Sequence, residues 1–144
     1  MVRPKLEYAT TVWTPHNRCY IDSLEAVQRR YLKFLYYKKF GVYPERNVPQ
    51  EVLLQEFLLE SLEKRRISKD IQFVTSVANG RMDCAPILQR LNFRVPRLHC
   101  KIRDTFYVAG SKRDCYKFAP VNRMCNEINN LSDEIDIFCN TNLR

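Results

Sequence analysis

The sequence has few glycines and lacks the compact motifs that mark many enzyme active sites. Its three glycines are isolated from one another, so the chain has no glycine-rich loop to bind the phosphates of a nucleotide. Neither a Gly-x-Ser-x-Gly nor a His-Glu-x-x-His motif occurs, which argues against hydrolases of either class. Phosphoryl transfer by two metal ions needs carboxylates that converge on divalent ions. The densest group of carboxylates lies at 133–136, where acidic residues that favour a helix start are a simpler explanation than a metal site. We therefore expect a protein that is not an enzyme and binds no cofactor.

Long apolar runs are missing as well. No run approaches the roughly 20 residues that a membrane-spanning helix requires. No apolar segment follows the charged N-terminus, as it would in a secretory signal. We expect no membrane partner and an intracellular protein, either nuclear or cytoplasmic.

The cysteines are numerous but form no recognisable framework. The six lie far apart, and no Cys-x-x-Cys pair occurs. A zinc site would need ligands at short spacings, and only His16 with Cys19 and His99 with Cys100 are His–Cys pairs close in sequence. Without a secretory signal, we expect reduced thiols, several of them buried, and no bound metal.

What the sequence does contain is an excess of positive charge on a chain long enough for one domain. The 144 residues, 45% of them hydrophobic, include 24 Lys and Arg against 16 Asp and Glu, a net charge of +8. Because two basic and four acidic residues lie from Ala119 onward, the first 118 residues carry +10. A basic body predicts an anionic partner, of which nucleic acid is the commonest large one and anionic lipid the alternative.

Residues 21–40 predict the helix around which the domain is organised. Asp22 and Glu25 resemble a capping box at its start, and Gly41 suits the position just after its end. One broad side is apolar and is expected to enter the core. This apolar set comprises Leu24, Val27, Tyr31, Leu32, Phe34 and Leu35. The other side carries Arg29, Arg30, Lys33, Tyr36 and Tyr37.

That second side of the helix has two interpretations. One is a solvated face whose long side chains cover apolar surface. The other is a nucleic-acid-binding face, on which guanidinium and ammonium groups contact phosphates while tyrosines stack on bases.

A second basic cluster lies on a helix predicted over 61–79. Ser61 is expected to cap this helix and Gly80 to follow its end. Arg66 and Asp70, four residues apart, are expected to pair. The cluster comprises Lys64, Arg65, Arg66 and Lys69, and the same two interpretations apply to it. Its candidate nucleic-acid-binding residues are Lys64, Arg65 and Lys69.

The remaining segments predict a mainly α fold, a small helical bundle with a less regular end. Short helices are expected over 1–13 and over 83–91, and a further one has Pro49 in its first turn. The segment 97–118 is strongly basic and predicts either an irregular stretch or a hairpin between 105–108 and 115–118. A helix from Pro120 to about 130 and a short helical turn at 133–139 follow. We divide the chain into a helical bundle over 1–96 and a basic extended segment with C-terminal helices over 97–144, packed on the same domain.

Short motifs in order over nearly the whole chain resemble a known family. They are VRPKLEYA (2–9), VWTP (12–15), LEAVQRRYL (24–32), LEKRR (62–66), NGRMDC (79–84), NFRVP (92–96) and PVNRMC (120–125). Together they resemble the region downstream of the catalytic palm in reverse transcriptases of non-LTR retrotransposons (LINE), in particular the jockey-like elements. The resemblance implies a thumb-like helical region that helps to hold template and primer beside the palm.

The motif that would make such a polymerase active is absent. No two aspartates are adjacent, so the aromatic-x-Asp-Asp motif that binds catalytic magnesium in the family is missing. The resemblance therefore implies a non-catalytic fragment of an RNA-directed DNA polymerase. Its partner would be RNA or an RNA–DNA hybrid, bound with little sequence preference. The alternative is a protein-interaction piece that packs against a missing palm, or self-associates, through apolar surface at Tyr8, Trp13 and 24–35.

Overall fold

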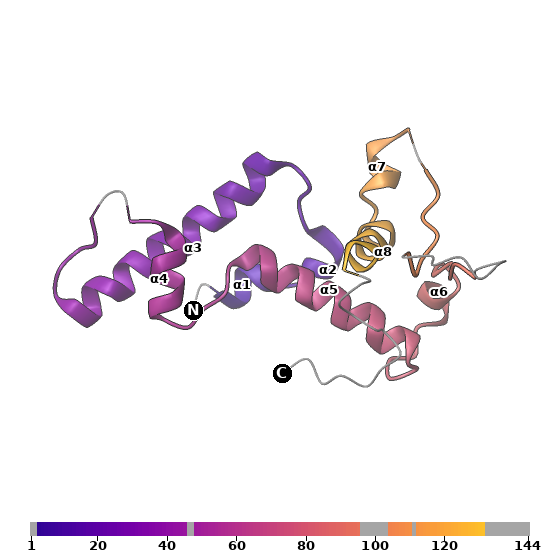
Figure 1. The fold of residues 1–144 in the computed structure, drawn as a ribbon, viewed down its shortest axis with the longest axis horizontal. Coiled ribbons are helices and arrows are strands. Elements are labelled where there is room, and N and C mark those ends of the chain that lie inside the picture. Colours follow the sequence, from indigo (N-terminus) through magenta and orange to yellow (C-terminus); the bar gives the residue numbers. More distant parts are fainter. Residues whose placement is uncertain (1–2, 46–47, 96–103, 111, 132–144) are drawn as a thin grey trace. The chain divides into compact units, whose positions relative to one another are not determined.

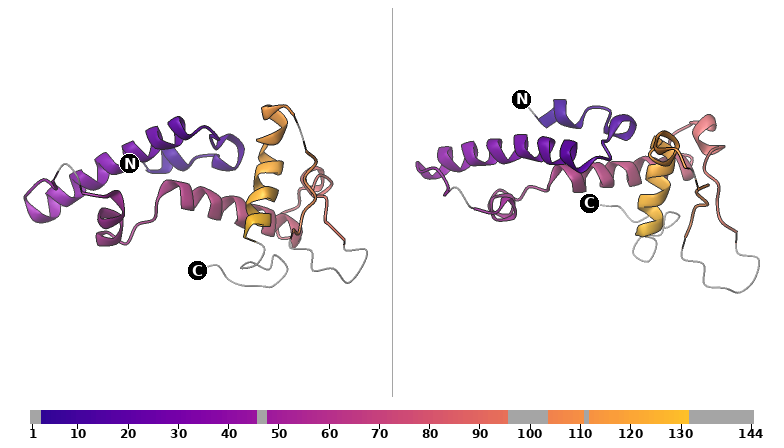
Figure 2. Two further views of the ribbon diagram at one scale, coloured as in Figure 1. Left: turned by 45° about the horizontal axis from the view of Figure 1, so that its top comes forward. Right: turned by 90° about the horizontal axis from the view of Figure 1, so that it is seen from above.

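The computed structural model describes residues 3–45, 48–95, 104–110 and 112–131, which are mainly helical (Figures 1 and 2). In chain order the helices are α1 (Arg3–Glu7), α2 (Thr10–Trp13), α3 (Arg18–Phe40), α4 (Gln50–Glu56), α5 (Leu62–Ala78), α6 (Ala85–Leu88), α7 (Asp114–Lys117) and α8 (Pro120–Asn130). No strand occurs within the described residues. The predicted mainly α fold class is confirmed.

The chain divides into two compact units, residues 1–66 and 67–144. The boundary between these two units lies within α5. Arg66 closes the first unit, and the apolar positions of α5 from Ile67 onward belong to the core of the second. Each unit therefore has its own core.

Several helix ends agree with the prediction because their signals are local. Gly41 and Gly80 have φ values of 72° and 67°, a left-handed conformation that glycine adopts at low cost after a helix. The Gly41 N–H donates to the carbonyl of Tyr37 at 2.9 Å and closes α3. Helix α8 begins at Pro120 as expected.

The predicted capping box of α3 is wrong, because the helix already begins at Arg18. Glu25 instead caps another helix. Its Oε1 accepts a hydrogen bond from the backbone N–H of Glu63 at 2.9 Å. Gln28 Oε1 accepts one from the N–H of Leu62 at 3.2 Å. Helix α3 thus supplies side-chain caps for backbone N–H groups at the start of α5, which have no partner within their own helix.

The first unit has a small core between α3 and α4, which lie side by side in Figures 1 and 2. Leu32 is fully buried and packs with Leu53 and Leu54 of α4. The predicted core side of α3 is only partly right. Tyr31 and Phe34 are each 46% exposed, and the other three members of the apolar set are half-buried. Because α4 packs against the flank that carries Leu32, the buried side is rotated from the predicted one.

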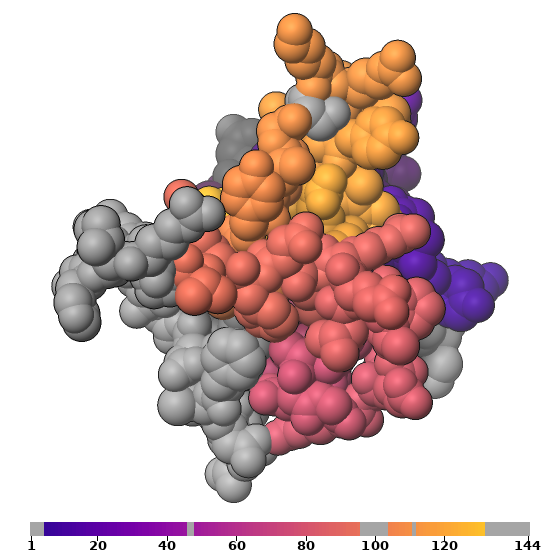
Figure 3. Space-filling view, turned by 90° about the vertical axis from the view of Figure 1, so that its right-hand side faces the viewer, coloured from indigo at the N-terminus to yellow at the C-terminus, as the bar shows by residue number. Residues whose placement is uncertain are grey.

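Helix α5 and helix α8 form the core of the second unit, together with the segments around α6 and 104–108. Figure 3 shows the segments around α6, 104–110 and 112–118 next to α8. The side chain of Asn129 bonds to both backbone groups of Phe106: its Oδ1 accepts from the N–H at 2.9 Å, and its Nδ2 donates to the carbonyl at 2.8 Å. These bonds hold the buried ring of Phe106 against α8.

A buried ionic cluster links α5 to α8. Asp70 Oδ2 accepts from Arg123 Nη2 at 3.0 Å and from Arg123 Nε at 3.2 Å. Glu127 Oε1 lies 3.9 Å from Arg123 Nε. The predicted pairing of Arg66 with Asp70 is therefore wrong. Arg66 is buried, with its guanidinium over the ring of Trp13 at 5.8 Å.

Of the two alternatives predicted for 97–118, the hairpin between 105–108 and 115–118 does not form, because the later segment makes up most of α7. Instead, Phe106 makes an antiparallel bridge with Phe93. The predicted opening helix over 1–13 is interrupted at Ala9, whose φ of 50° separates α1 from α2. Residues 96–103 and the predicted helical turn at 133–139 lie outside the described residues.

Candidate nucleic-acid interface

The five candidate residues on α3 lie in three adjacent turns near its C-terminal end. At roughly 100° per residue they share one side of the helix. Their exposure differs: Arg29, Arg30 and Tyr37 are exposed, whereas Lys33 and Tyr36 are half-buried. Their contacts divide them further.

Arg30 and Lys33 are the cations best placed to meet an external anion. Among the residues that the structure describes, no carboxylate lies within ion-pair distance of either. They are three residues apart, so they are neighbours on the helix surface. Tyr37 follows Lys33 by one turn on the same side.

Arg29 is engaged within the protein. Its Nε donates to Gln50 Oε1 at 3.1 Å, and Gln50 Nε2 donates to Glu25 Oε2 at 2.7 Å. Arg29 also lines a polar cavity of about 410 Å³. The charged lining of this cavity consists of Arg18, Arg29 and Lys64 against Asp22, Glu25, Glu51, Glu60 and Glu63. Since carboxylates outnumber cations there, a phosphate is disfavoured at Arg29 and at Lys64.

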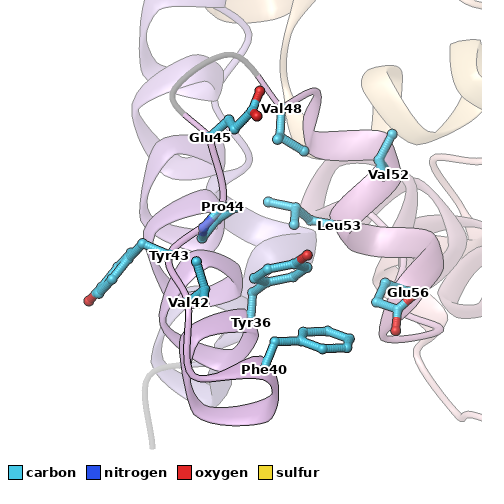
Figure 4. A pocket seen from close by; sticks show the side chains of 10 residues that line it. All are labelled: Tyr36, Phe40, Val42, Tyr43, Pro44, Glu45, Val48, Val52, Leu53 and Glu56. Atoms are coloured by element: carbon cyan, nitrogen blue, oxygen red, sulfur yellow. The ribbon is translucent and has the colours of Figure 1, made fainter.

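Tyr36 does not present a free stacking surface. It packs against the core of the first unit, and its ring centroid lies 4.5 Å from that of Phe40. Both rings line an open, mainly apolar cavity of about 620 Å³ beside α4, shown in Figure 4. The predicted role of Tyr36 in base stacking therefore loses its geometric support.

Tyr37, in contrast, stacks on Tyr43. Tyr43 is not among the residues that the sequence predicted for the interface. The ring centroids are 4.6 Å apart, and the ring planes differ by 22°. Tyr37 is 42% exposed and Tyr43 is 60% exposed. Gly41 is the sequence feature that could have indicated this stacking. A left-handed residue after α3 reverses the chain and brings residues 42–44 back along the helix.

The residues of the second basic cluster differ in their contacts. Arg65 Nη2 lies 2.9 Å from Glu7 Oε2, and the Arg65 side chain is 19% exposed. Lys64 is exposed but borders the acid-rich cavity. Lys69 is half-buried, has an interaction partner and belongs to the second unit. The three residues therefore have different surroundings: Arg65 is in an ion pair, Lys64 is at an acid-rich cavity, and Lys69 is in the second unit.

The described cysteines are free thiols. Burial raises the pKa of the Cys125 thiol to about 11, so it stays protonated. Cys100 and Cys139 lie outside the described residues. The described part of the chain contains no group of three or more His, Cys, Asp or Glu side chains that could hold a metal ion.

The chain offers few other indications of function. None of the helices in the described ranges has both the length and the apolar character needed to cross a membrane. Comparison of the chain with protein-family models, with curated proteins and with solved structures found no match.

Proposed function

We propose that this chain is a non-catalytic nucleic-acid-binding protein that contacts phosphates through Arg30 and Lys33. The observation that carries the proposal is the position of these two cations on one side of α3, beside Tyr37 and away from the described carboxylates. The net charge of +8 adds long-range attraction for a polyanion. Contacts to phosphates carry little base information, so binding is tolerant of sequence.

The motif resemblance supports a narrower form of the proposal. The chain would correspond to the thumb-like region after the palm in a reverse transcriptase of a non-LTR retrotransposon. Its partner would then be RNA or an RNA–DNA hybrid, in the nucleus or the cytoplasm. The absence of paired aspartates supports a binding role without polymerase activity.

Replacing Arg30 and Lys33 together by alanine is expected to weaken binding about tenfold at moderate salt. Loss of two phosphate contacts should also reduce the slope of log K against log salt by about 2, because fewer counterions are released. Fluorescence anisotropy with labelled RNA–DNA hybrid and labelled single strands, over a range of salt concentrations, measures both effects.

The matched control is the double variant Arg18→Ala with Lys64→Ala. It removes the same charge from the same unit, but at the acid-rich cavity. We expect its salt slope to remain that of the unmodified chain. Equal effects of the two double variants would mean that only net charge matters, and would refute a contact surface on α3.

A second candidate function is supported by exposed aromatic surface. Tyr8 is 78% exposed, and Tyr31 and Phe34 lie exposed on the predicted core side of α3. Such surface suits a protein neighbour, either a polymerase palm or a second copy of the chain. This candidate predicts concentration-dependent association by light scattering after size-exclusion chromatography, removed by Tyr31→Ser with Phe34→Ser. A monomer at all concentrations contradicts the self-association form.

A further inference from the structure

We infer that the stacked rings of Tyr37 and Tyr43 form a platform for an unpaired base, which gives the α3 surface a preference for single-stranded over duplex nucleic acid. The inference deepens the proposed function and rests on it. It names the strand type that the surface binds, and it assigns a role to Tyr43.

The platform is already formed in the free chain. Its centroid distance of 4.6 Å is typical of offset-stacked aromatic pairs. Tyr43 is the outer and more exposed member. In Figure 4 its ring points away from the apolar cavity beside α4. Because the turn closed by Gly41 holds the pair together, little ordering is needed when a base adds to the stack.

Cations lie next to the platform along the same helix. Lys33 is one turn before Tyr37, and Arg30 is about two turns before it, which corresponds to axial distances of about 6 and 10 Å. Long, flexible lysine and arginine side chains can cover such distances. A strand whose base stacks on Tyr43 would therefore have its backbone within reach of both cations.

Stacking on Tyr43 favours single-stranded over duplex nucleic acid, because the faces of the bases are accessible only in a single strand. In a duplex both faces of each base are covered by stacked neighbours, and exposing one costs a few kcal/mol. In a single strand the faces are accessible, and stacking on an aromatic side chain contributes about 1–3 kcal/mol per base. Phosphate contacts alone would give no such preference.

The test compares binding of the whole chain to labelled oligothymidylate and to a labelled blunt-ended duplex of equal charge, which has no unpaired loop. We expect the unmodified chain to bind oligothymidylate at least about tenfold more tightly. Tyr43→Leu should lose roughly that factor for oligothymidylate and leave duplex binding unchanged, since leucine keeps apolar bulk but cannot stack. Tyr43→Phe should retain the preference, because the ring remains.

A second variant gives a direct signal even if Tyr43→Leu is poorly folded. In Tyr43→Trp, a base stacking on the introduced indole should quench its fluorescence, with the emission of Trp13 measured separately in the unmodified chain. Unquenched emission at saturating oligothymidylate, or equal loss of single-strand and duplex binding in Tyr43→Leu, would overturn the inference.

These outcomes separate the inference from the proposed function. If Arg30→Ala with Lys33→Ala binds every probe as tightly as the unmodified chain, the proposed function fails. If that variant binds weakly while Tyr43→Leu keeps full affinity for oligothymidylate, only the single-strand inference fails.

Discussion

Arg123→Ala is expected to lower the free energy of unfolding of the second unit by about 3–5 kcal/mol near pH 8. Arg123 is the charge partner of the fully buried Asp70 and lies beside the half-buried Glu127. Removing the guanidinium leaves both carboxylates without their cation. A buried charge that loses its partner destabilises far more than the pair itself stabilises. Urea unfolding followed by helical circular dichroism measures the loss.

The loss should depend on pH because the carboxyl groups of this cluster titrate abnormally. Burial, reinforced by Asp70, raises the pKa of Glu127 from 4.5 to about 7, while Arg123 opposes the shift. Burial also raises the pKa of Asp70. The folded unit therefore keeps the Glu127 proton where the unfolded chain has lost it. Stability of the unmodified protein should fall as pH rises from about 4.5 to about 7 and then level off.

In Arg123→Ala the cation that opposed these shifts is gone, so both pKa values rise further. The deficit relative to the unmodified protein should consequently be smaller near pH 5, where protonated carboxyl groups need no partner, than near pH 8. The matched control is Arg94→Ala. Its ion pair with Asp104, at 2.7 Å, is about half exposed and should contribute at most about 1 kcal/mol. Similar losses in the two variants, or a pH-independent deficit, would contradict the buried cluster.

Local chemistry made part of this fold predictable. Gly41 and Gly80 end helices through their own backbone freedom, and Pro120 fits a first helical turn. Partners distant in sequence explain the errors. Glu25 has the spacing of a capping box within α3, but its carboxylate accepts a hydrogen bond from the backbone N–H of Glu63 at the N-terminus of α5. Arg66 had the spacing to pair with Asp70, but Trp13 lies under its guanidinium.

The candidate interface shows the same limit. Residue type and helical spacing correctly grouped Arg30, Lys33 and Tyr37 on α3. They could not indicate that Arg29 bonds to Gln50, or that Tyr43 returns to stack on Tyr37. Such contacts depend on where α4 and the turn after α3 lie, which one helix alone does not specify.

Leu32→Ala is expected to destabilise the first unit by about 2–5 kcal/mol. Leu32 is fully buried between α3 and α4 and packs with Leu53 and Leu54. Truncation removes apolar contact and leaves a cavity in a core too small to compensate by rearrangement. Because this contact fixes α4 against α3, single-strand binding through Tyr43, in the connection between the two helices, should weaken as well.

Phe34→Ala is the matched control, because the sequence pattern alone placed Phe34 and Leu32 on the same apolar side. In the structure Phe34 is 46% exposed, with the Lys38 ammonium 5.8 Å from its ring centroid. Nearly half of its surface therefore remains in water on folding, so its loss should cost far less than that of Leu32, about 1 kcal/mol. Chemical unfolding of both variants decides which side of α3 is buried. If Phe34→Ala proves as damaging as Leu32→Ala, the helix turns its predicted apolar side inward, and the placement of Arg30 and Lys33 changes with it.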